Sequence, residues 1–285
     1  MIRSFFKRLW RLITAPFRLI ARPFVAIRNF ISYEPEDAPL EDVFARAIEN
    51  PSVLVEHIEA LRGHLFRSLL ALIVAVGIST IFAERVLNWL SLPVGGTQAL
   101  QAIEVTESIG AFMRVSLLSG FTIAVPYIGI EMFAFINPGL RRRERVMLLI
   151  AIPIASILFI TGLYFAYKFM LPIALPFLLD FMNIATVPRP SNYIRFVTGV
   201  MFWTGIAFQF PLVIYTLAAL GIVKAKSLIN GWRFAILGIA ILAAMITPTI
   251  DPVNMALVMA PMIALYFISI GLAAIAQRRR HRQSV

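Results

Sequence analysis

The chain contains no cysteine and only three histidines, and both shortages exclude several kinds of chemistry. Without cysteine there is no disulfide, no thiol nucleophile and no thiolate metal ligand. His57, His64 and His281 lie outside the long apolar runs, and their spacing fits no zinc motif. No histidine, cysteine or lysine in an apolar run stands beside a serine or aspartate, and there is no glycine-rich phosphate loop. We therefore expect neither an enzyme nor a metal or cofactor site.

Charge is also missing, from six long stretches of the chain. These uncharged runs cover residues 68–83, 115–130, 146–167, 196–223, 234–250 and 253–276. Most of them can cross ~30 Å of hydrocarbon as a helix, which takes about 20 residues. They are solidly apolar and do not alternate, which argues against membrane β-strands. With 60% apolar residues and a mean hydropathy of +0.84, the chain is predicted to be an all-α membrane protein with six transmembrane helices.

Basic residues are unevenly divided between the segments that join these runs. The loops that follow the first, third and fifth runs would lie on one side of the membrane. Only five of the 26 lysines and arginines lie in these loops: Arg85, Arg114, Lys168, Arg189 and Arg195. The others lie in the amino-terminal segment, the loops after the second and fourth runs, and the tail. Such an excess marks the cytoplasmic side, so we expect a multi-pass protein of the cell inner membrane with both termini cytoplasmic. The net charge of +11 then indicates attraction to anionic lipids rather than to nucleic acid.

The composition divides the chain into three parts. Residues 1–52 form a basic amphipathic extension followed by an acidic linker, residues 53–277 form the transmembrane domain, and residues 278–285 form a basic tail. The first outer loop, residues 84–114, is expected to begin with a short helix that ends before Pro93 and Gly95. A bend is expected at Pro211, and the fifth run is short for a full crossing.

Three polar residues in or beside the apolar runs are candidates for function, each with an alternative. Glu131 is either a functional charge within the membrane or a residue that reaches the interface and pairs with a loop arginine. Gln209 either contacts a partner helix or joins helices within the bundle. Asp251 lies in a short loop between prolines, where a helix-capping turn is sufficient to explain it.

Two groups of charges flank the first and second runs on the expected cytoplasmic side. Glu56, Glu59 and Arg62 precede the first run, and Phe135 and Glu144 belong to the segment after the second. Carboxylates on adjacent helix ends could bind a basic peptide through its guanidinium groups. The alternative is that these charges neutralise one another at the interface.

The order of these residues resembles the TatC family, the multispanning receptor subunit of the twin-arginine protein translocase. The resemblance covers about residues 53–277 and is carried by motifs near each helix end: His57, Leu61, Arg62, Pro93, Thr106, Glu107, Phe112, Arg114, Pro126, Phe135, Pro138, Gly139, Leu140, Glu144, Arg145, Tyr164, Tyr167, Tyr193, Phe196, Gly205, Phe208, Pro211, Thr247, Pro248, Asp251, Pro252, Pro261, Leu265 and Tyr266.

The resemblance implies a concave, glove-like six-helix bundle that recognises twin-arginine signal peptides on its cytoplasmic face. It also implies export of folded client proteins with TatA/TatB-like single-span partners, several copies of the chain in one complex, and the proton-motive force as the driving force. On this resemblance we expect Glu144, Phe135 and Arg62 to contact the signal peptide, together with Glu56 and Glu59 as the carboxylates of the first helix. We expect Gln209, Pro211 and Asp251 to contact partners.

The chain departs from the family pattern at three positions. Ala60, Gln209 and Phe267 stand where the family usually has glutamate. Glu56 lies one helical turn before Ala60 on the same face, so we expect it to substitute for the missing carboxylate, whereas Glu59 points about 100° away. The rival function is a small-molecule secondary transporter, which usually shows inverted repeats and several polar groups at mid-membrane. The chain shows no such repeat, and only Gln209 is clearly central.

Overall fold

The computed structural model describes residues 51–137, 142–179, 187–246 and 252–281, and the regular structure in these ranges is entirely helical. Residues 1–50 of the predicted extension and linker (residues 1–52) lie outside the described residues, and so does Asp251. The α-helices are α3 (Pro51–Ser79), α4 (Ala83–Ser91), α5 (Glu107–Ile136), α6 (Arg142–Phe165), α7 (Leu171–Leu179), α8 (Pro190–Ala207), α9 (Phe210–Leu220), α10 (Ala225–Asn230), α11 (Trp232–Ile246) and α12 (Pro252–His281).

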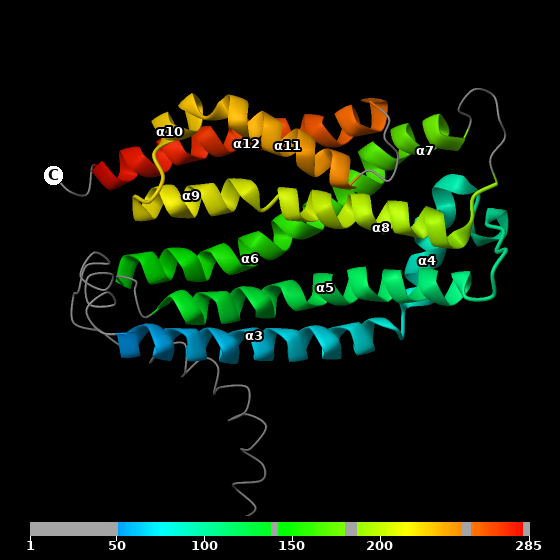
Figure 1. Ribbon diagram of the computed structural model, residues 1–285, viewed down its shortest axis with the longest axis horizontal. Coiled ribbons are helices and arrows are strands. Elements are labelled where there is room, and N and C mark those ends of the chain that lie inside the picture. The colour runs from blue at the N-terminus through cyan, green and yellow to red at the C-terminus, as the bar shows by residue number, and fades with distance from the viewer. Residues whose placement is uncertain (1–50, 138–141, 180–186, 247–251, 282–285) are drawn as a thin grey trace, which may run out of the picture.

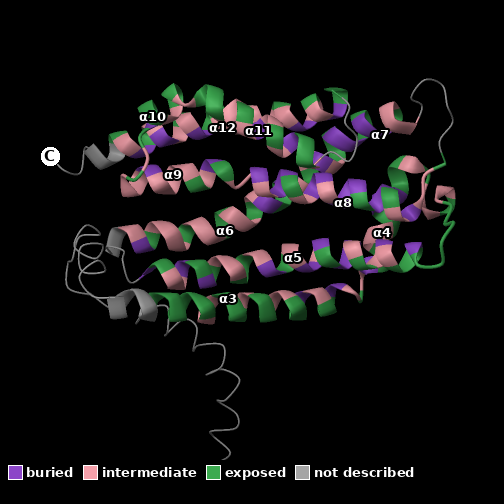
Figure 2. Ribbon diagram, viewed as in Figure 1, coloured by how far each residue is buried: buried purple, intermediate pink, exposed green. Residues whose placement is uncertain are grey.

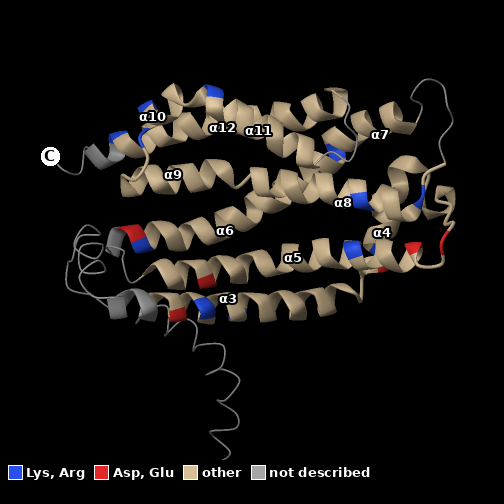
Figure 3. Ribbon diagram, viewed as in Figure 1, with Lys and Arg blue, Asp and Glu red and all other residues tan. Residues whose placement is uncertain are grey.

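The long helices run side by side, and their ends gather at two opposite ends of the molecule (Figure 1). One end, which we call the Glu144 end, holds the starts of α3 and α6 and the last residues of α5, α9 and α12. The other, which we call the Arg189 end, holds α4, α7 and the starts of α5 and α8. Charged residues occur mostly toward these ends of the described helices, and long stretches between them are uncharged (Figure 3).

Five of the helical segments are long and apolar enough to cross a membrane. They are His57–Ser79, Glu107–Ile136, Glu144–Leu179, Pro190–Leu220 and Pro252–Arg278. The sixth apolar helix, α11, has 15 residues and is therefore only about 22 Å long. The prediction that the fifth apolar run is short is confirmed for its described part.

Close contacts between helices occur where glycine replaces a side chain. A Cβ added to Gly120 of α5 would lie 2.6 Å from the backbone of Val76 in α3. A Cβ on Gly162 of α6 would lie 2.8 Å from the Cα of Gly205 in α8. Because lipid is as apolar as leucine, helices in a membrane associate through such close packing rather than through a hydrophobic driving force.

The fourth apolar run is interrupted near the predicted bend. Helix α8 ends at Ala207 and α9 begins at Phe210, so the break lies at Phe208 and Gln209. Pro211 falls in the first turn of α9, where a missing backbone N–H breaks no helical hydrogen bond. The predicted break is therefore confirmed, two residues before the proline itself.

The third apolar run extends further than its sequence pattern indicates. The pattern predicts an end near Tyr167, but the helix continues through a π-helical turn at Ala166–Met170 into α7. Met170, Leu171, Ala174 and Leu175 are buried against the core formed with α5 and α8. Because this packing outweighs the local charge of Lys168, the helix continues into the segment that the pattern assigns to a loop.

Burial is concentrated on α8 and on one face of α5, whereas α3 is exposed along most of its length (Figure 2). Its exposed residues are mainly apolar, such as Leu69, Ile73 and Ile78. An apolar surface of this extent is typical of a helix that contacts lipid.

The predicted short helix of the first outer loop is α4, which ends before Pro93. Gly95 and Gly96 follow it with positive φ angles of 97° and 91°.

Candidate functional site: the Glu144 end

A carboxylate cluster joins α3 to α5 near the Glu144 end. The Nε of Arg67 donates to both oxygens of Glu131, at 3.0 and 3.1 Å, and Tyr127 donates its hydroxyl to the same carboxylate at 2.8 Å. The Nδ1 of His64 lies 2.6 Å from Glu131. The glutamate is buried, with 7% of its surface exposed. Glu131 forms an ion pair, but it is buried and its partner is Arg67 of α3 rather than the predicted loop arginine at the interface. A functional role of this charge stays a prediction.

One ring nitrogen of His64 contacts both members of the ion pair. Its Nδ1 lies 2.6 Å from the Glu131 carboxylate, which can only accept, and 2.8 Å from the Nη2 of Arg67, which can only donate. The tautomer of the imidazole therefore decides which of the two contacts is the hydrogen bond, and either one holds His64 in the cluster.

Phe135 lies between the Glu131 cluster and the Glu144 end of the molecule. It lies one turn after Glu131 on α5, and the ring of His57 stacks on it at a centroid distance of 4.5 Å. The ring of His64 contacts its edge at 6.0 Å. The aromatic ring predicted for the peptide site therefore lies between two imidazoles of α3.

The predicted carboxylates lie on the two helices that flank α5. Glu144 is in the first turn of α6 and is partly buried, and its neighbour Arg145 is almost completely buried, with 2% exposed. Glu59 and Arg62 are exposed on α3. Residues 53–66 are helical, as predicted, so Glu56 is one turn before Ala60, although its side chain lies outside the described part.

Two of the three residues predicted to contact a partner, Gln209 and Pro211, lie at or beside the break between α8 and α9. The side-chain amide of Gln209 donates to the carbonyl oxygen of Ala155 in α6 at 3.1 Å. Pro211 is buried. The amide therefore links two helices of the bundle, and it still has a second N–H and its carbonyl oxygen for other contacts.

A second ionic cluster, at the Arg189 end, has no counterpart in the predictions from sequence. Arg189, just before α8, pairs with the buried Glu107 at the start of α5 and with the exposed Glu104 at 3.1 Å. The hydrogen bonds from Arg189 to Glu107, and then to Glu104, raise the pKa of this arginine further above its ordinary value. It is therefore protonated at any working pH and fixes the loop before α8 to α5.

Nothing in the described residues provides a metal site, because no three histidine, aspartate or glutamate side chains converge there. The described residues of the Glu144 end combine carboxylates, imidazoles and arginines with the aromatic ring of Phe135. Carboxylates and an aromatic face are groups that can bind cations such as guanidinium.

Comparison with known proteins gives the same picture. Residues 56–261 match the family described as Sec-independent protein translocase protein (TatC). The chain belongs to the TatC family. It is 36% identical over 220 residues to the Sec-independent protein translocase protein TatC of Synechocystis sp.. The alignment covers 76% of this chain and 86% of that relative. It is also 36% identical over 233 residues to the TatC of Deinococcus radiodurans, covering 78% and 86%.

The fold agrees with a solved structure as well. A crystal structure of the twin-arginine translocase receptor TatC superposes with a TM-score of 0.69 at 31% sequence identity, covering 77% of this chain and 99% of the other. This chain is therefore a multi-pass membrane component of a Sec-independent protein translocase, and its relatives are named as transport subunits.

Proposed function

We propose that this TatC-family chain recognises twin-arginine signal peptides at its Glu144 end. With TatA/TatB-like single-span partners, it supports export of folded client proteins driven by the proton-motive force. The observation that carries the proposal is that Glu144 and Phe135, the residues the family resemblance assigns to the peptide, lie at the same end of the bundle as the exposed Glu59 of α3.

In the proposed site, Glu144 is the main anion for the arginines of the peptide. One carboxylate binds only one guanidinium in a bidentate manner, so a twin-arginine motif needs a second acceptor. Ala60 does not provide it. Glu56, one turn away on the same helix face, substitutes with a longer reach, and Phe135 supplies an aromatic surface beside it. Arg62 and Glu59 lie at the rim of the site.

A titration of a labelled signal peptide against the protein in nanodiscs tests these roles. Glu144→Lys should weaken binding by at least tenfold, since a hydrogen bond to a charged group contributes about 1.5–3 kcal/mol. Ala60→Glu should tighten binding, and Glu56→Gln should weaken it more than the matched variant Glu59→Gln. Unchanged affinity in Glu144→Lys, or the largest loss in Glu59→Gln, would contradict the assignment.

The partner contact is proposed for the break between α8 and α9, at Gln209 and Pro211, with Asp251 as a further contact residue. A photo-crosslinking residue at position 209 should capture a small single-span protein in native membranes. The same residue at Ile157, an exposed position on α6, is the control. Capture at 157 but not at 209 would favour a purely internal role for Gln209.

The proposed topology has six spans, a concave glove-like shape and both termini in the cytoplasm, so that the Glu144 end faces the cytoplasm. Single cysteines can be introduced into this cysteine-free chain without background. Cysteines at Gln98 and Lys224 should react with an impermeant reagent from opposite sides of the membrane. Reaction of both from one side would refute the arrangement.

A further inference from the structure

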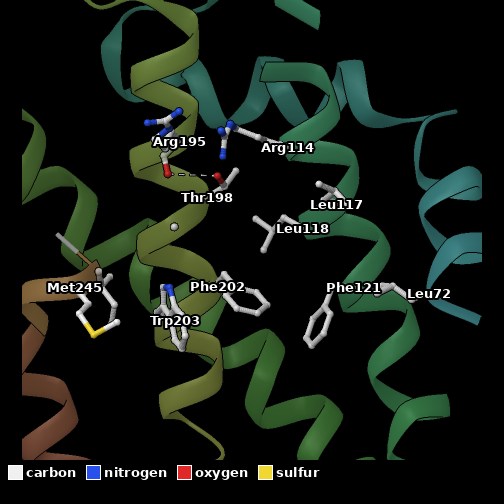
Figure 4. A pocket seen from close by; sticks show the side chains of 12 residues that line it. Leu72, Arg114, Leu117, Leu118, Phe121, Arg195, Thr198, Phe202, Trp203 and Met245 are labelled. Carbon is white, nitrogen blue, oxygen red and sulfur yellow. Dashed lines mark hydrogen bonds between the residues drawn. The ribbon is translucent and has the colours of Figure 1, made fainter. Parts of the chain in front are cut away.

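An open pocket of about 480 Å³ lies between α3, α5, α8 and the end of α11 (Figure 4). Its walls are largely apolar and aromatic, with Phe121 of α5 and Phe202 and Trp203 of α8 among them. Arg114 and Arg195 line it too, and Figure 4 shows both of these side chains at one end of the pocket and the three aromatic rings at the other. The pocket therefore has a cationic end and an apolar end.

The two arginines lack an acidic counterpart in the pocket. None of the residues that line it is an aspartate or glutamate. Among the described residues, none of the ion pairs that the structure contains involves Arg114 or Arg195. Two guanidinium groups at one end of a pocket that no carboxylate lines form a site at which an external anion can bind.

The depth of these residues agrees with that of a lipid molecule. Arg114 is seven residues after the start of α5 and Arg195 five after the start of α8, about 10 and 8 Å from the helix ends. Trp203 is eight residues further along α8 than Arg195, about 12 Å deeper. Helix α5 has 30 residues and is about 45 Å long, enough to span the hydrocarbon and both headgroup regions, which together are about 40–45 Å thick. If its ends lie at the outer edges of the headgroup regions, the arginines lie near the boundary between headgroups and hydrocarbon, and the aromatic rings lie deeper, among the acyl chains.

We propose that this pocket binds an anionic phospholipid from the leaflet at the Arg189 end. The phosphate lies between the guanidinium groups of Arg114 and Arg195, which suit a phosphodiester because each presents a planar fork of N–H donors. One acyl chain lies along Phe121, Phe202 and Trp203. A soluble anion would leave this aromatic surface without a partner, whereas a phospholipid fills both ends of the pocket.

Quenching of Trp203 by brominated lipid tests the proposal. The full-length chain is prepared with Trp10, Trp89 and Trp232 replaced by phenylalanine, so that Trp203 is the only tryptophan. It is placed in phosphatidylcholine nanodiscs that contain a small fraction of lipid brominated on its acyl chains. Brominated phosphatidylglycerol should reach half-maximal quenching at a mole fraction about tenfold lower than brominated phosphatidylcholine, the ratio expected of one strong charged contact.

The arginines are tested by matched charge removal. Arg114→Gln with Arg195→Gln should make the two lipids quench equally. Arg85→Gln with Lys168→Gln removes two exposed positive charges toward the same end but outside the pocket, and it should keep the preference. Unchanged quenching by brominated phosphatidylcholine reports that the paired variant is folded. If it is not folded, Arg195→Gln alone, at an exposed position, should reduce the preference.

Three results would overturn the proposal. The first is equal quenching by the two lipids in the parent chain. The second is a preference that survives loss of Arg114 and Arg195. The third is loss of the preference when millimolar inorganic phosphate is added, because the site would then bind a soluble anion. None of these results bears on signal-peptide binding at the Glu144 end, so the lipid site can fail while the proposed function stands.

Discussion

Glu131 can be changed to glutamine to measure what the carboxylate cluster contributes to the association of α3 with α5. In the native chain this buried group accepts hydrogen bonds from Arg67 and Tyr127 and lies 2.6 Å from the Nδ1 of His64. Glutamine has nearly the same shape, but it replaces one acceptor oxygen by an NH₂ group. That group is then directed at donors, so at least one polar contact is lost together with the ion pair.

The expected loss is about 2 kcal/mol. A hydrogen bond to a charged group contributes about 1.5–3 kcal/mol, but the side chain of Arg67 is 49% exposed, so water screens its part to about 1 kcal/mol or less. The contact with His64, whose side chain is only 19% exposed, supplies most of the remainder. A single interhelical hydrogen bond in a membrane contributes about 0.6–2 kcal/mol, so two such contacts are sufficient to give a loss of this size.

The assay is reversible unfolding of the purified protein in mixed micelles with increasing sodium dodecyl sulfate. Glu59→Gln, the same change at an exposed site on α3, is the control and should cost less than about 0.5 kcal/mol. In a double-mutant cycle, Glu131→Gln and Arg67→Gln should show a coupling of about 1 kcal/mol. If Glu131→Gln is as stable as the control, or if the two changes are strictly additive, the cluster does not hold the helices together.

Two further predictions use the same unfolding assay. Gly162→Ala should lower the free energy of unfolding by about 1–3 kcal/mol, because the added Cβ would lie 2.8 Å from the backbone of α8. Gly77→Ala, where the Cβ would have nothing within 4 Å, should be neutral or stabilising. Equal losses in the two glycine variants would contradict the packing argument. Arg189→Gln should lower the free energy of unfolding by about 2 kcal/mol, because it leaves the buried Glu107 without its cation. Glu104→Gln removes the exposed partner and should cost under about 0.5 kcal/mol, so a larger loss in this variant would be contrary to expectation.

The membrane class, the short α4 and the break before Pro211 could all be predicted because each has a local cause. An uncharged run of about 20 residues has few alternatives to a spanning helix, and glycines with positive φ end the turn after α4. The family could also be predicted, because many weak motifs occur in one order. The extension of α6 through the π-helical turn into α7 could not, because it depends on packing against α8, far away in sequence.

Long-range polar pairs were the least predictable part of the candidate site. Arg189 and Glu107 are 82 residues apart and share no pattern. For Glu131, one local signal was available: Tyr127 lies one turn before it, and His64 and Arg67 are three residues apart on one face of α3. That signal identifies two polar faces within apolar helices, but only the register of α3 against α5 brings them together.

That register also determines the geometry of the proposed peptide site. Helix α3 is largely exposed, and its contacts with the rest of the described bundle are mainly with α5. Those contacts include the hydrogen bond from Ser79 to the Ser116 carbonyl at 2.6 Å, the close approach at Gly120, and the Glu131 cluster nearest the Glu144 end. His57 and Glu59 lie within two turns of that cluster, so their position relative to α6 depends on it. The interior carboxylate is therefore connected to the proposed peptide-binding surface through α3, and we expect weakening of the cluster to loosen the end of α3 that presents the exposed charges.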